Sequence, residues 1–266
     1  KSLSWKKVRA KKQLGQHFLT NLQVASDTVS AFGTEANFKN AIEIGAGMGV
    51  LTEALNKRSD LDFKVVDIDQ ESIAYLAENK LVEHSQLIHD DFLKMDLKEI
   101  FGDQPFGIIG NFPYNISTQI LFKLYEHRDQ AVELVGMFQK EVAERVVSPP
   151  GSKVYGITSV LLQAYYDVDY LFTVDEHDFD PPPKVKSAVI RLKRNQTKEL
   201  NPFRKIQLLA QIEQFLPDIS VSGNPEETLL QKFHGLQQNI QPFCRMKPCS
   251  THQDEFIFPN PDFFPN

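Results

Sequence analysis

Asn40-Ala-Ile-Glu-Ile-Gly-Ala-Gly-Met-Gly49 is the most informative segment of this 266-residue chain. It starts as a short apolar strand and ends in closely spaced glycines, after which residues 51–56 have the pattern of a helix. Glycines let the backbone turn sharply and approach a ligand closely. Tight turns without a ligand are common, so the stretch by itself is only weak evidence for a ligand site.

Strands and helices alternate along the chain on both sides of this stretch. Strands are expected at residues 40–45, 63–67, 86–89 and 106–110, and helices at residues 23–32, 51–56 and 70–81. This alternation predicts an α/β fold with a parallel, doubly wound sheet flanked by helices. Ligands of such sheets bind beyond the carboxyl ends of the strands, and we expect the helix over residues 23–32 to cover the entrance of that site.

Later segments complete the sheet and suggest a second unit. A strand that passes into a helix is expected over residues 133–147, a helix over 155–165, and strands over 166–174 and 187–192. The composition changes after Lys193, and amphipathic patterns at residues 205–216 and 226–236 predict a small helical C-terminal domain. We therefore divide the chain into a basic arm that begins the ligand site (1–20), an α/β domain (21–195) and an atypical C-terminal domain (196–266).

Charge and composition limit the classes of protein. The sequence has no run of about 18 apolar residues, which argues against a membrane span. The basic start, residues 1–12, has no apolar core, so we favour an exposed arm over a secretory signal or a mitochondrial presequence remnant. The formal net charge of -6 argues mildly against a nucleic-acid partner. The clustered lysines of the arm could still hold phosphates, although charge alone favours a solvated terminus.

Cys244 and Cys249 are the only cysteines in the sequence. They form no zinc-binding pattern with nearby histidines, so no metal site is expected. We expect free thiols in a reducing environment, and hence a cytoplasmic protein.

The spacing of the glycines selects among cofactors. A dinucleotide fingerprint would be G-x-G-x-x-G, wrapped around a pyrophosphate. Here Gly45, Gly47 and Gly49 form G-x-G-x-G, and Val50 follows. This pattern fits a cofactor that has no pyrophosphate and whose amino-acid part lies against the glycine backbone.

Carboxylates follow the second and third expected strands. Asp67 ends the second strand, where a carboxylate can accept from both hydroxyl groups of a ribose. Asp69 is a competitor that could instead cap the next helix, and we prefer Asp67. After the third strand, Asp91 could accept from the amine of an adenine, and its neighbour Asp90 is an alternative.

The fourth expected strand ends in Gly110-Asn-Phe-Pro-Tyr-Asn-Ile-Ser117. This segment offers what methylation of an aryl amine needs, because such an amine is a poor nucleophile until two acceptors hold its N–H groups. The Asn111 side-chain oxygen is one acceptor, and the carbonyl of Phe112 or Pro113 is the other, with the proline ring keeping that carbonyl aimed. Tyr114 can stack on an extruded base. Taken alone, the segment could equally be an Asn-Pro turn with a buried tyrosine.

A second aromatic element is Phe179-Asp-Pro-Pro-Pro-Lys-Val185. Three consecutive prolines make a stiff, extended segment. It could present Phe179 to the other face of the base. The alternative is a rigid connector with Phe179 in the core.

Together these residues resemble the small-subunit rRNA adenine N6-dimethyltransferase family (KsgA type). The resemblance covers about residues 8–193, and although any one segment is modest evidence, the ordered set is highly specific. The matching segments are residues 12–19, with the sequence Lys-Gln-Leu-Gly-Gln-His-Phe-Leu, and residues 43–52, 111–117, 139–145, 150–156 and 179–187.

The resemblance implies a class I methyltransferase fold and the cofactor S-adenosylmethionine. It assigns cofactor contacts to His17, Leu19, Gly45, Gly47, Asp67, Asp91 and Asn111, with Gly45 at the methionine part, Asp67 at the ribose and Asp91 at the adenine. It also assigns the target amine to residues 111–114 and base stacking to Phe179. The implied partner is small-subunit rRNA in an immature subunit, where family members dimethylate two adjacent adenosines in a hairpin loop near the 3′ end. A monomer is expected.

The chain departs from the family pattern in three places. Phe112 stands where Leu or Ile is usual, and Asp67 where Glu is usual; both changes are mild. Family members usually carry a strongly basic helix in the C-terminal region, whereas this chain has only Phe203-Arg-Lys-Ile206 and then a sparsely charged stretch. Residues 200–266 therefore match the family poorly.

Other functions compete with this one. A large-subunit rRNA adenine methyltransferase would use the same core. A ribosome-assembly or RNA-binding factor with little or no methylation is a rival from another class, against which the intact Asn111 and Tyr114 weigh. Methylation of an amine in DNA is a weaker option.

Overall fold

A twisted seven-stranded sheet forms the centre of the molecule, in the part of the chain that the computed structural model describes, residues 8–34 and 38–195. Five neighbouring strands are parallel, and the sixth, β9, runs antiparallel to both of its neighbours. In spatial order the strands are β4 (Leu87–His89), β3 (Asp62–Asp67), β2 (Asn40–Ile44), β5 (Phe106–Asn111), β6 (Ala131–Gln139), β9 (Ser187–Arg194) and β7 (Tyr166–Val174).

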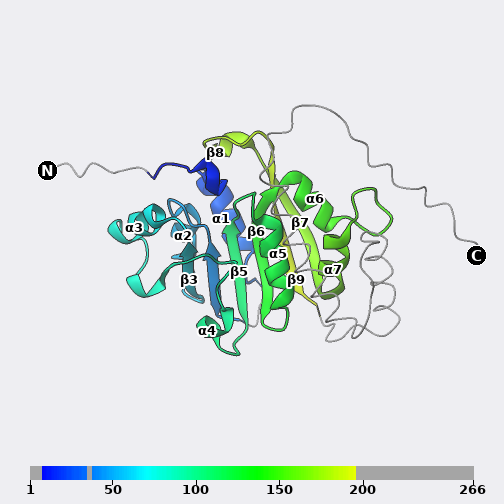
Figure 1. Ribbon diagram of the computed structural model, residues 1–266, viewed down its shortest axis with the longest axis horizontal. Helices are drawn as coiled ribbons and strands as arrows, with labels where there is room; N and C mark the ends of the chain where they lie inside the picture. Colours follow the sequence, from blue (N-terminus) through cyan, green and yellow to red (C-terminus); the bar gives the residue numbers. More distant parts are fainter. Residues whose placement is uncertain (1–7, 35–37, 196–266) are drawn as a thin grey trace, which may run out of the picture.

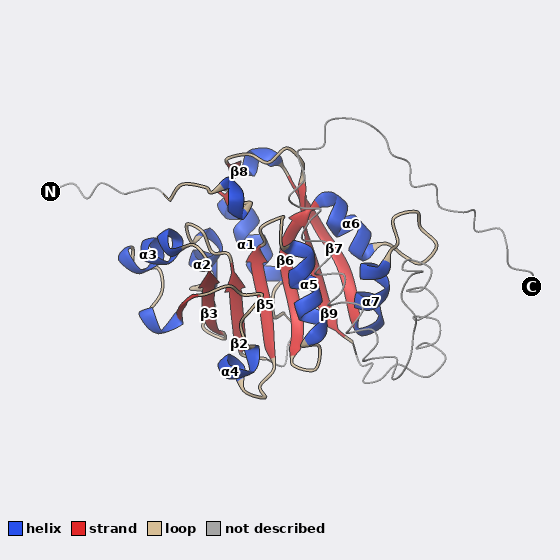
Figure 2. Ribbon diagram, viewed as in Figure 1, coloured by secondary structure: helices blue, strands red, loops and turns tan. Residues whose placement is uncertain are grey.

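Helices cover both faces of this sheet (Figures 1 and 2). On one face lie α4 (Leu97–Phe101), α5 (Ser117–Glu126), α6 (Lys140–Val147) and α7 (Ile157–Tyr165). On the other lie α1 (Leu22–Ala31), α2 (Val50–Leu55) and α3 (Gln70–Glu78). The result is a three-layer α/β arrangement of the Rossmann-like kind, as the sequence predicted.

The strand β2 shows why an apolar run gives this arrangement. Successive side chains of a strand point to opposite faces. Ile42 and Ile44 accordingly pack in the core beneath α5, while Ala41 packs in the core beneath α1 and α2. Burying each large aliphatic side chain of this kind contributes about 1.5–3 kcal/mol, so a strand covered on both faces is strongly held.

A small second sheet closes over the carboxyl ends of the large one. It consists of β1 (Phe18–Leu19) and β8 (Phe179–Asp180), which pair antiparallel. A turn of 3-10 helix, η1 (Lys12–Leu14), precedes β1, and another, η3 (Glu176–Asp178), precedes β8. A further turn, η2 (His84–Gln86), leads into β4. The small sheet joins the arm to a segment far along the chain.

Most strand and helix predictions are confirmed, and the parallel sheet is confirmed for the five neighbouring strands from β4 to β6. Only β9 runs in the opposite direction, because residues 175–186 between β7 and β9 contain only η3 and β8. A parallel return would need a longer crossover, usually an α-helix. The helix expected over residues 70–81 ends at Glu78, and Lys80 adopts a left-handed conformation with φ 52°.

The helix α1 does not cover the site entrance, contrary to the prediction. Its buried side chains Ala25 and Val29 pack under the sheet, and the C-cap Phe32 is fully buried. An apolar stripe of this kind holds the helix against the sheet face and away from the strand ends. No described helix is long and apolar enough to cross a membrane. The helices expected at 205–216 and 226–236, and both cysteines, lie outside the described residues.

Candidate active site

A cavity of about 250 Å³ lies at the carboxyl ends of β2, β3, β4 and β5, where the fold predicts a ligand site. Its wall is formed by the arm, the glycine turn, the ends of β3 and β4, and the loop from β5 into α5. The lining residues include Gly15, Gln16, His17, Gly45, Gly47, Asp67, Ile68, Asp90, Asp91, Asn111, Phe112, Pro113, Tyr114 and Gln119. Most of the predicted site residues are therefore brought together.

The glycine turn is locked by its backbone geometry. Gly45, Gly47 and Gly49 all have positive φ, at 72°, 55° and 81°. Residues other than glycine rarely adopt this backbone conformation. A Cβ at Gly47 would also lie 2.6 Å from the Phe18 ring of the arm. The turn therefore needs glycine both for its shape and for the close approach of the arm.

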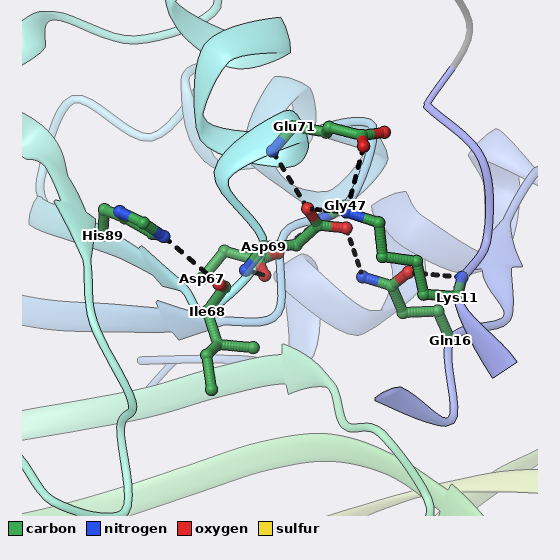
Figure 3. Close-up of polar contacts among 8 residues, drawn as sticks. All are labelled: Lys11, Gln16, Gly47, Asp67, Ile68, Asp69, Glu71 and His89. Atoms are coloured by element: carbon green, nitrogen blue, oxygen red, sulfur yellow. Dashed lines mark hydrogen bonds and ion pairs between the residues drawn. The ribbon is translucent and has the colours of Figure 1, made fainter. Parts of the chain in front are cut away.

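Of the carboxylates Asp67 and Asp69, both drawn in Figure 3, only Asp67 lines the cavity. Its oxygens accept from the backbone N–H groups of Gly47, at 3.2 Å, and Asp69, at 2.8 Å. Burial raises the pKa of the Asp67 carboxyl, and these two N–H groups oppose that shift. Asp69 instead caps α3 by accepting from the N–H of Glu71 at 2.9 Å. The role that the sequence offered as the alternative for Asp69 is thus the one observed.

Both Asp90 and Asp91 line the cavity beyond β4. One Asp91 oxygen accepts from the N–H of Leu93 at 3.1 Å, and the other lies 3.4 Å from Lys94 Nζ. Asp91 therefore holds the turn that follows β4 as well as facing the cavity. Its contact with an adenine remains a prediction.

The Asn111 side chain is held by a contact from the arm. Its amide nitrogen donates to the backbone carbonyl of His17 at 2.8 Å. Because that nitrogen is committed as a donor, the amide oxygen is the end that can accept from a ligand. Asn111 therefore lies at the cavity with a fixed orientation, as its predicted role requires.

The Phe112 ring anchors the loop that follows Asn111. It is 1% exposed and packs edge-on against Phe138, with ring centroids 5.0 Å apart. Gly110 and Gly136 leave the space for it, because a Cβ at either position would clash with the ring. The next carbonyl, that of Pro113, accepts from the N–H of Ile116 at 3.1 Å. The loop backbone is thus fixed from both sides.

Tyr114 and His17 form an aromatic pair at the cavity. Their ring centroids are 5.4 Å apart with an interplanar angle of 30°. The Tyr114 hydroxyl shares a 2.5 Å hydrogen bond with Ser187 Oγ, and His17 Nδ1 lies 2.7 Å from the Pro181 carbonyl oxygen. Burial raises the pKa of the Tyr114 hydroxyl. The sequence did not single out Ser187, although it ends the last family-like segment.

Phe179 is not brought to the cavity. It pairs with Leu19 across the small sheet, and both side chains are 3% exposed in the same core. The exposed stacking position is therefore not observed, and the alternative of a core residue describes this structure. Leu19 also lies behind the main cavity, at a smaller adjoining one that Asn111 shares.

Glu43 is a site residue that the sequence reasoning did not assign. It is fully buried beside the glycine turn and lines the smaller cavity. One oxygen accepts from Thr52 Oγ at 2.7 Å, whereas the other is buried with no partner among the described residues. Burial raises the pKa of Glu43 to about 8. A carboxylate in the strand just before a glycine turn is the signal that could have found it.

A model of the family described as ribosomal RNA adenine dimethylase matches residues 7–213. The chain belongs to the ribosomal RNA adenine dimethylase family. The match includes the arm, the glycine turn, the Asn111 loop and the small sheet, so it spans every wall of the cavity. It also continues past residue 195 into the part of the chain expected to be atypical.

Similar proteins agree with this family. Ribosomal RNA small subunit methyltransferase A of Cytophaga hutchinsonii is 59% identical over 194 residues, which are 73% of this chain and 75% of the relative. The protein of the same name from Phocaeicola vulgatus is 44% identical over 250 residues, covering 94% and 88%. The second alignment therefore also extends into residues 196–266.

The solved structure of the 23S rRNA methyltransferase ErmE shares the fold. It superposes with a TM-score of 0.64 and is 24% identical, covering 81% of this chain and 84% of that chain. An identity this low supports the class I methyltransferase fold alone. The much higher identity to small-subunit methyltransferases is the finding that separates the leading function from the large-subunit rival.

The adenine dimethylase family uses S-adenosylmethionine, and the residues of the cavity fit that cofactor. The glycine backbone offers a surface for the amino-acid part, beside the buried Glu43 oxygen that has no partner within residues 8–34 and 38–195. Asp67 is the next carboxylate along the sheet edge, and Asp90 and Asp91 lie beyond it. This order along the sheet edge is the order of the cofactor's own parts.

Proposed function

We propose that this chain transfers methyl groups from S-adenosylmethionine to N6 of two adjacent adenosines in the 3′-terminal hairpin of small-subunit rRNA, as a step of ribosome biogenesis. The observation that carries the proposal is the oriented Asn111 amide at a cavity bounded by the glycine turn and Asp67. Family membership and the names of the relatives support the same reaction.

Two acceptors in the Asn111 loop activate the amine. The lone pair of an adenine amine is delocalised into the ring, and acceptors on both N–H groups favour a more tetrahedral nitrogen. Asn111 Oδ1 is the first acceptor, since its nitrogen is bound to His17. The Phe112 carbonyl is the better candidate for the second, because the Pro113 carbonyl already accepts from Ile116. Preorganised acceptors of this kind cost no rearrangement during the reaction.

S-adenosylmethionine supplies an electrophilic methyl group on a positively charged sulfur when it is bound. The chain needs no strong general base, because the proton can leave the nitrogen after transfer. The rings of Tyr114 and His17 give the cavity an aromatic wall, which favours a nearby cation. The wall and the acceptors together place the amine.

Tyr114 is the residue that we assign to stacking on the target base. Its hydroxyl contact with Ser187 and its ring contact with His17 fix the ring at the cavity. Stacking by Phe179 would require that ring to leave the core it shares with Leu19. Loop adenosines suit such a site, because single-stranded bases are already accessible for extrusion.

The partner follows from the same proposal. We assign the substrate to rRNA within an immature small subunit, bound by a monomer in the cytoplasm. Relatives named for small-subunit rRNA support the choice of RNA. The DNA alternative and the non-methylating assembly factor lack a supporting observation of this kind.

Labelled cofactor tests the proposal and separates it from the large-subunit rival. Purified protein is incubated with labelled S-adenosylmethionine and with small or large ribosomal subunits that lack the modification. The proposal predicts label in small-subunit rRNA only. Label in large-subunit rRNA would support the rival, and none in either rRNA would support the assembly-factor alternative.

A further inference from the structure

Lys11 and Gln16 of the arm both bind one buried carboxylate, Asp69 (Figure 3). Lys11 Nζ lies 2.6 Å from Asp69 Oδ1, and Gln16 Nε2 donates to Asp69 Oδ2 at 3.1 Å. The Asp69 side chain has no exposed surface. Gln16 Oε1 in turn accepts from the backbone N–H of Lys11 at 2.8 Å, which closes a ring of contacts. The two arm residues and Asp69 therefore act as one unit, here named the Asp69 clamp.

The clamp holds a segment that forms one wall of the active-site cavity. Gly15, Gln16 and His17 line the cavity, directly after the turn that Lys11 begins. His17 contributes the carbonyl that orients Asn111 and the ring that faces Tyr114. A displaced arm would therefore open the cavity and release the amide that holds the target amine.

On its other side, the clamp contacts Asp67, the carboxylate that we assign to the cofactor ribose. The backbone N–H of Asp69 donates to Asp67 Oδ1, and Asp67 Oδ2 accepts from Gly47. Asp69 thus binds the arm with its side chain and Asp67 with its backbone. A short chain of contacts joins Lys11 to the glycine turn.

We infer that Asp69 is a positioning residue, which holds the arm closed over the cofactor through Lys11 and Gln16. The inference rests on the proposed function, because it concerns the cofactor site. If the cofactor binds only while the arm is docked on Asp69, the apparent affinity for the cofactor falls with the fraction of molecules in which the arm is docked. Since Lys11 is partly exposed, salt screens its attraction to Asp69. Cofactor affinity should therefore fall as ionic strength rises.

Asp69→Asn is the most selective variant. Asn caps helices as well as Asp does, so the cap of α3 is retained. The amide oxygen can still accept from Glu71 N–H, while the buried charge opposite Lys11 is lost and the amide nitrogen cannot accept from Gln16. The exposed carboxylate of Glu71, which lies 3.2 Å from Lys11 Nζ, is unchanged. Lys11→Met removes the other side of the pair. Lys12→Met is the matched control, because Lys12 is an exposed neighbour in the same arm.

Calorimetric binding of S-adenosylhomocysteine at low salt is the first readout. We expect Asp69→Asn and Lys11→Met each to weaken binding about fivefold, and the double variant to be no weaker than the singles. Lys12→Met should bind like wild type. Added salt should weaken wild-type binding and have little effect on Asp69→Asn.

Amide hydrogen exchange separates positioning from general destabilisation. In Asp69→Asn, exchange over residues 8–19 should accelerate while α3 stays protected. In steady-state assays the KM for the cofactor should rise more than the KM for rRNA. Exposure of α3 together with the arm would instead show that Asp69 only stabilises the fold.

The two proposals fail in different ways. If wild-type protein does not bind S-adenosylhomocysteine, the proposed function fails. If it binds, but folded Asp69→Asn and Lys11→Met bind within twofold of wild type at low salt, the clamp is overturned and the function stands.

Discussion

Asn111 and Glu43 both lie beside the glycine turn, but their side chains differ in exposure and in hydrogen bonding. The Asn111 amide has one end bound and the other available at the cavity. Glu43 is buried with one oxygen bound to Thr52 and the other without a hydrogen-bond partner in the part of the chain that the structure describes. At the residue scale, the first arrangement predicts a loss of chemistry on substitution, and the second predicts a dependence of stability on pH.

Asn111→Ala should abolish methyl transfer while leaving cofactor binding within a few fold of wild type. It removes one of the two acceptors, whereas the glycine turn and Asp67 stay in place. Single-turnover assays with saturating cofactor measure the first effect, and calorimetry with S-adenosylhomocysteine measures the second. Retained turnover would show that the acceptor argument is wrong.

Glu43→Gln should remove a pH dependence of stability. The folded-state pKa of about 8 lies above the ordinary value of 4.5, so Glu43 stabilises the fold fully below pH 4.5 and less as pH rises towards 8. Between pH 5 and pH 8 the free energy of unfolding of Glu43→Gln should therefore rise relative to that of wild type by at least about 1 kcal/mol, given about 1.4 kcal/mol per pKa unit. Urea unfolding measures it, with exposed Glu53→Gln as the control. Equal pH profiles for wild type and Glu43→Gln would contradict the assignment.

At the scale of elements, the sequence predicted best where one strand carries its own signal. Buried apolar runs that end in glycine or a carboxylate marked β2, β3 and β5. The helix α5 was missed, although its residues 120–125 are all buried, including Lys123. The sequence did not decide whether Phe179 is buried, because its burial depends on pairing with Leu19, far away in sequence.

Gly136→Ala should impair the Asn111 loop from the neighbouring strand. A methyl group there clashes with the Phe112 ring, which holds the loop in place. Overpacking of this kind costs about 1–3 kcal/mol, and the displaced loop should lower turnover at least about tenfold. Circular dichroism checks the fold, and Gly156→Ala is the control because its Cβ would meet nothing closer than 4.0 Å. Wild-type turnover in Gly136→Ala would show that the ring does not position the loop.

Lys123→Met should loosen the turn that follows β4. Lys123 Nζ donates to the carbonyls of Leu93 and Met95 at 3.1 and 2.5 Å, and Leu93 lines the cavity. Removing the donor leaves buried carbonyls unpaired, which costs about 1–3 kcal/mol for each group. The free energy of unfolding, measured with urea, and the affinity for S-adenosylhomocysteine should both fall. The exposed control Lys98→Met should change neither. An unchanged affinity in Lys123→Met would mean that the turn needs no support from α5.

At the scale of the whole molecule, the cavity is assembled from four regions that are distant in sequence. The arm, the glycine turn, the strand ends and the Asn111 loop meet because parallel strands bring their carboxyl ends to one edge. The sequence could predict this meeting for Asp67 and Asn111, since each ends a strand. It could not predict the Asp69 clamp or the small sheet, because both depend on how the arm folds back onto the sheet.

Mapping the modified bases shows which atoms of the rRNA receive the methyl groups. Small subunits that lack the modification are treated with the protein and unlabelled S-adenosylmethionine, and nuclease fragments of the rRNA are analysed by mass spectrometry. The account predicts two methyl groups on N6 of each of two adjacent adenosines in the 3′-terminal hairpin, and none with Asn111→Ala. An unmodified hairpin, or methyl groups at any other atom or position, would contradict it.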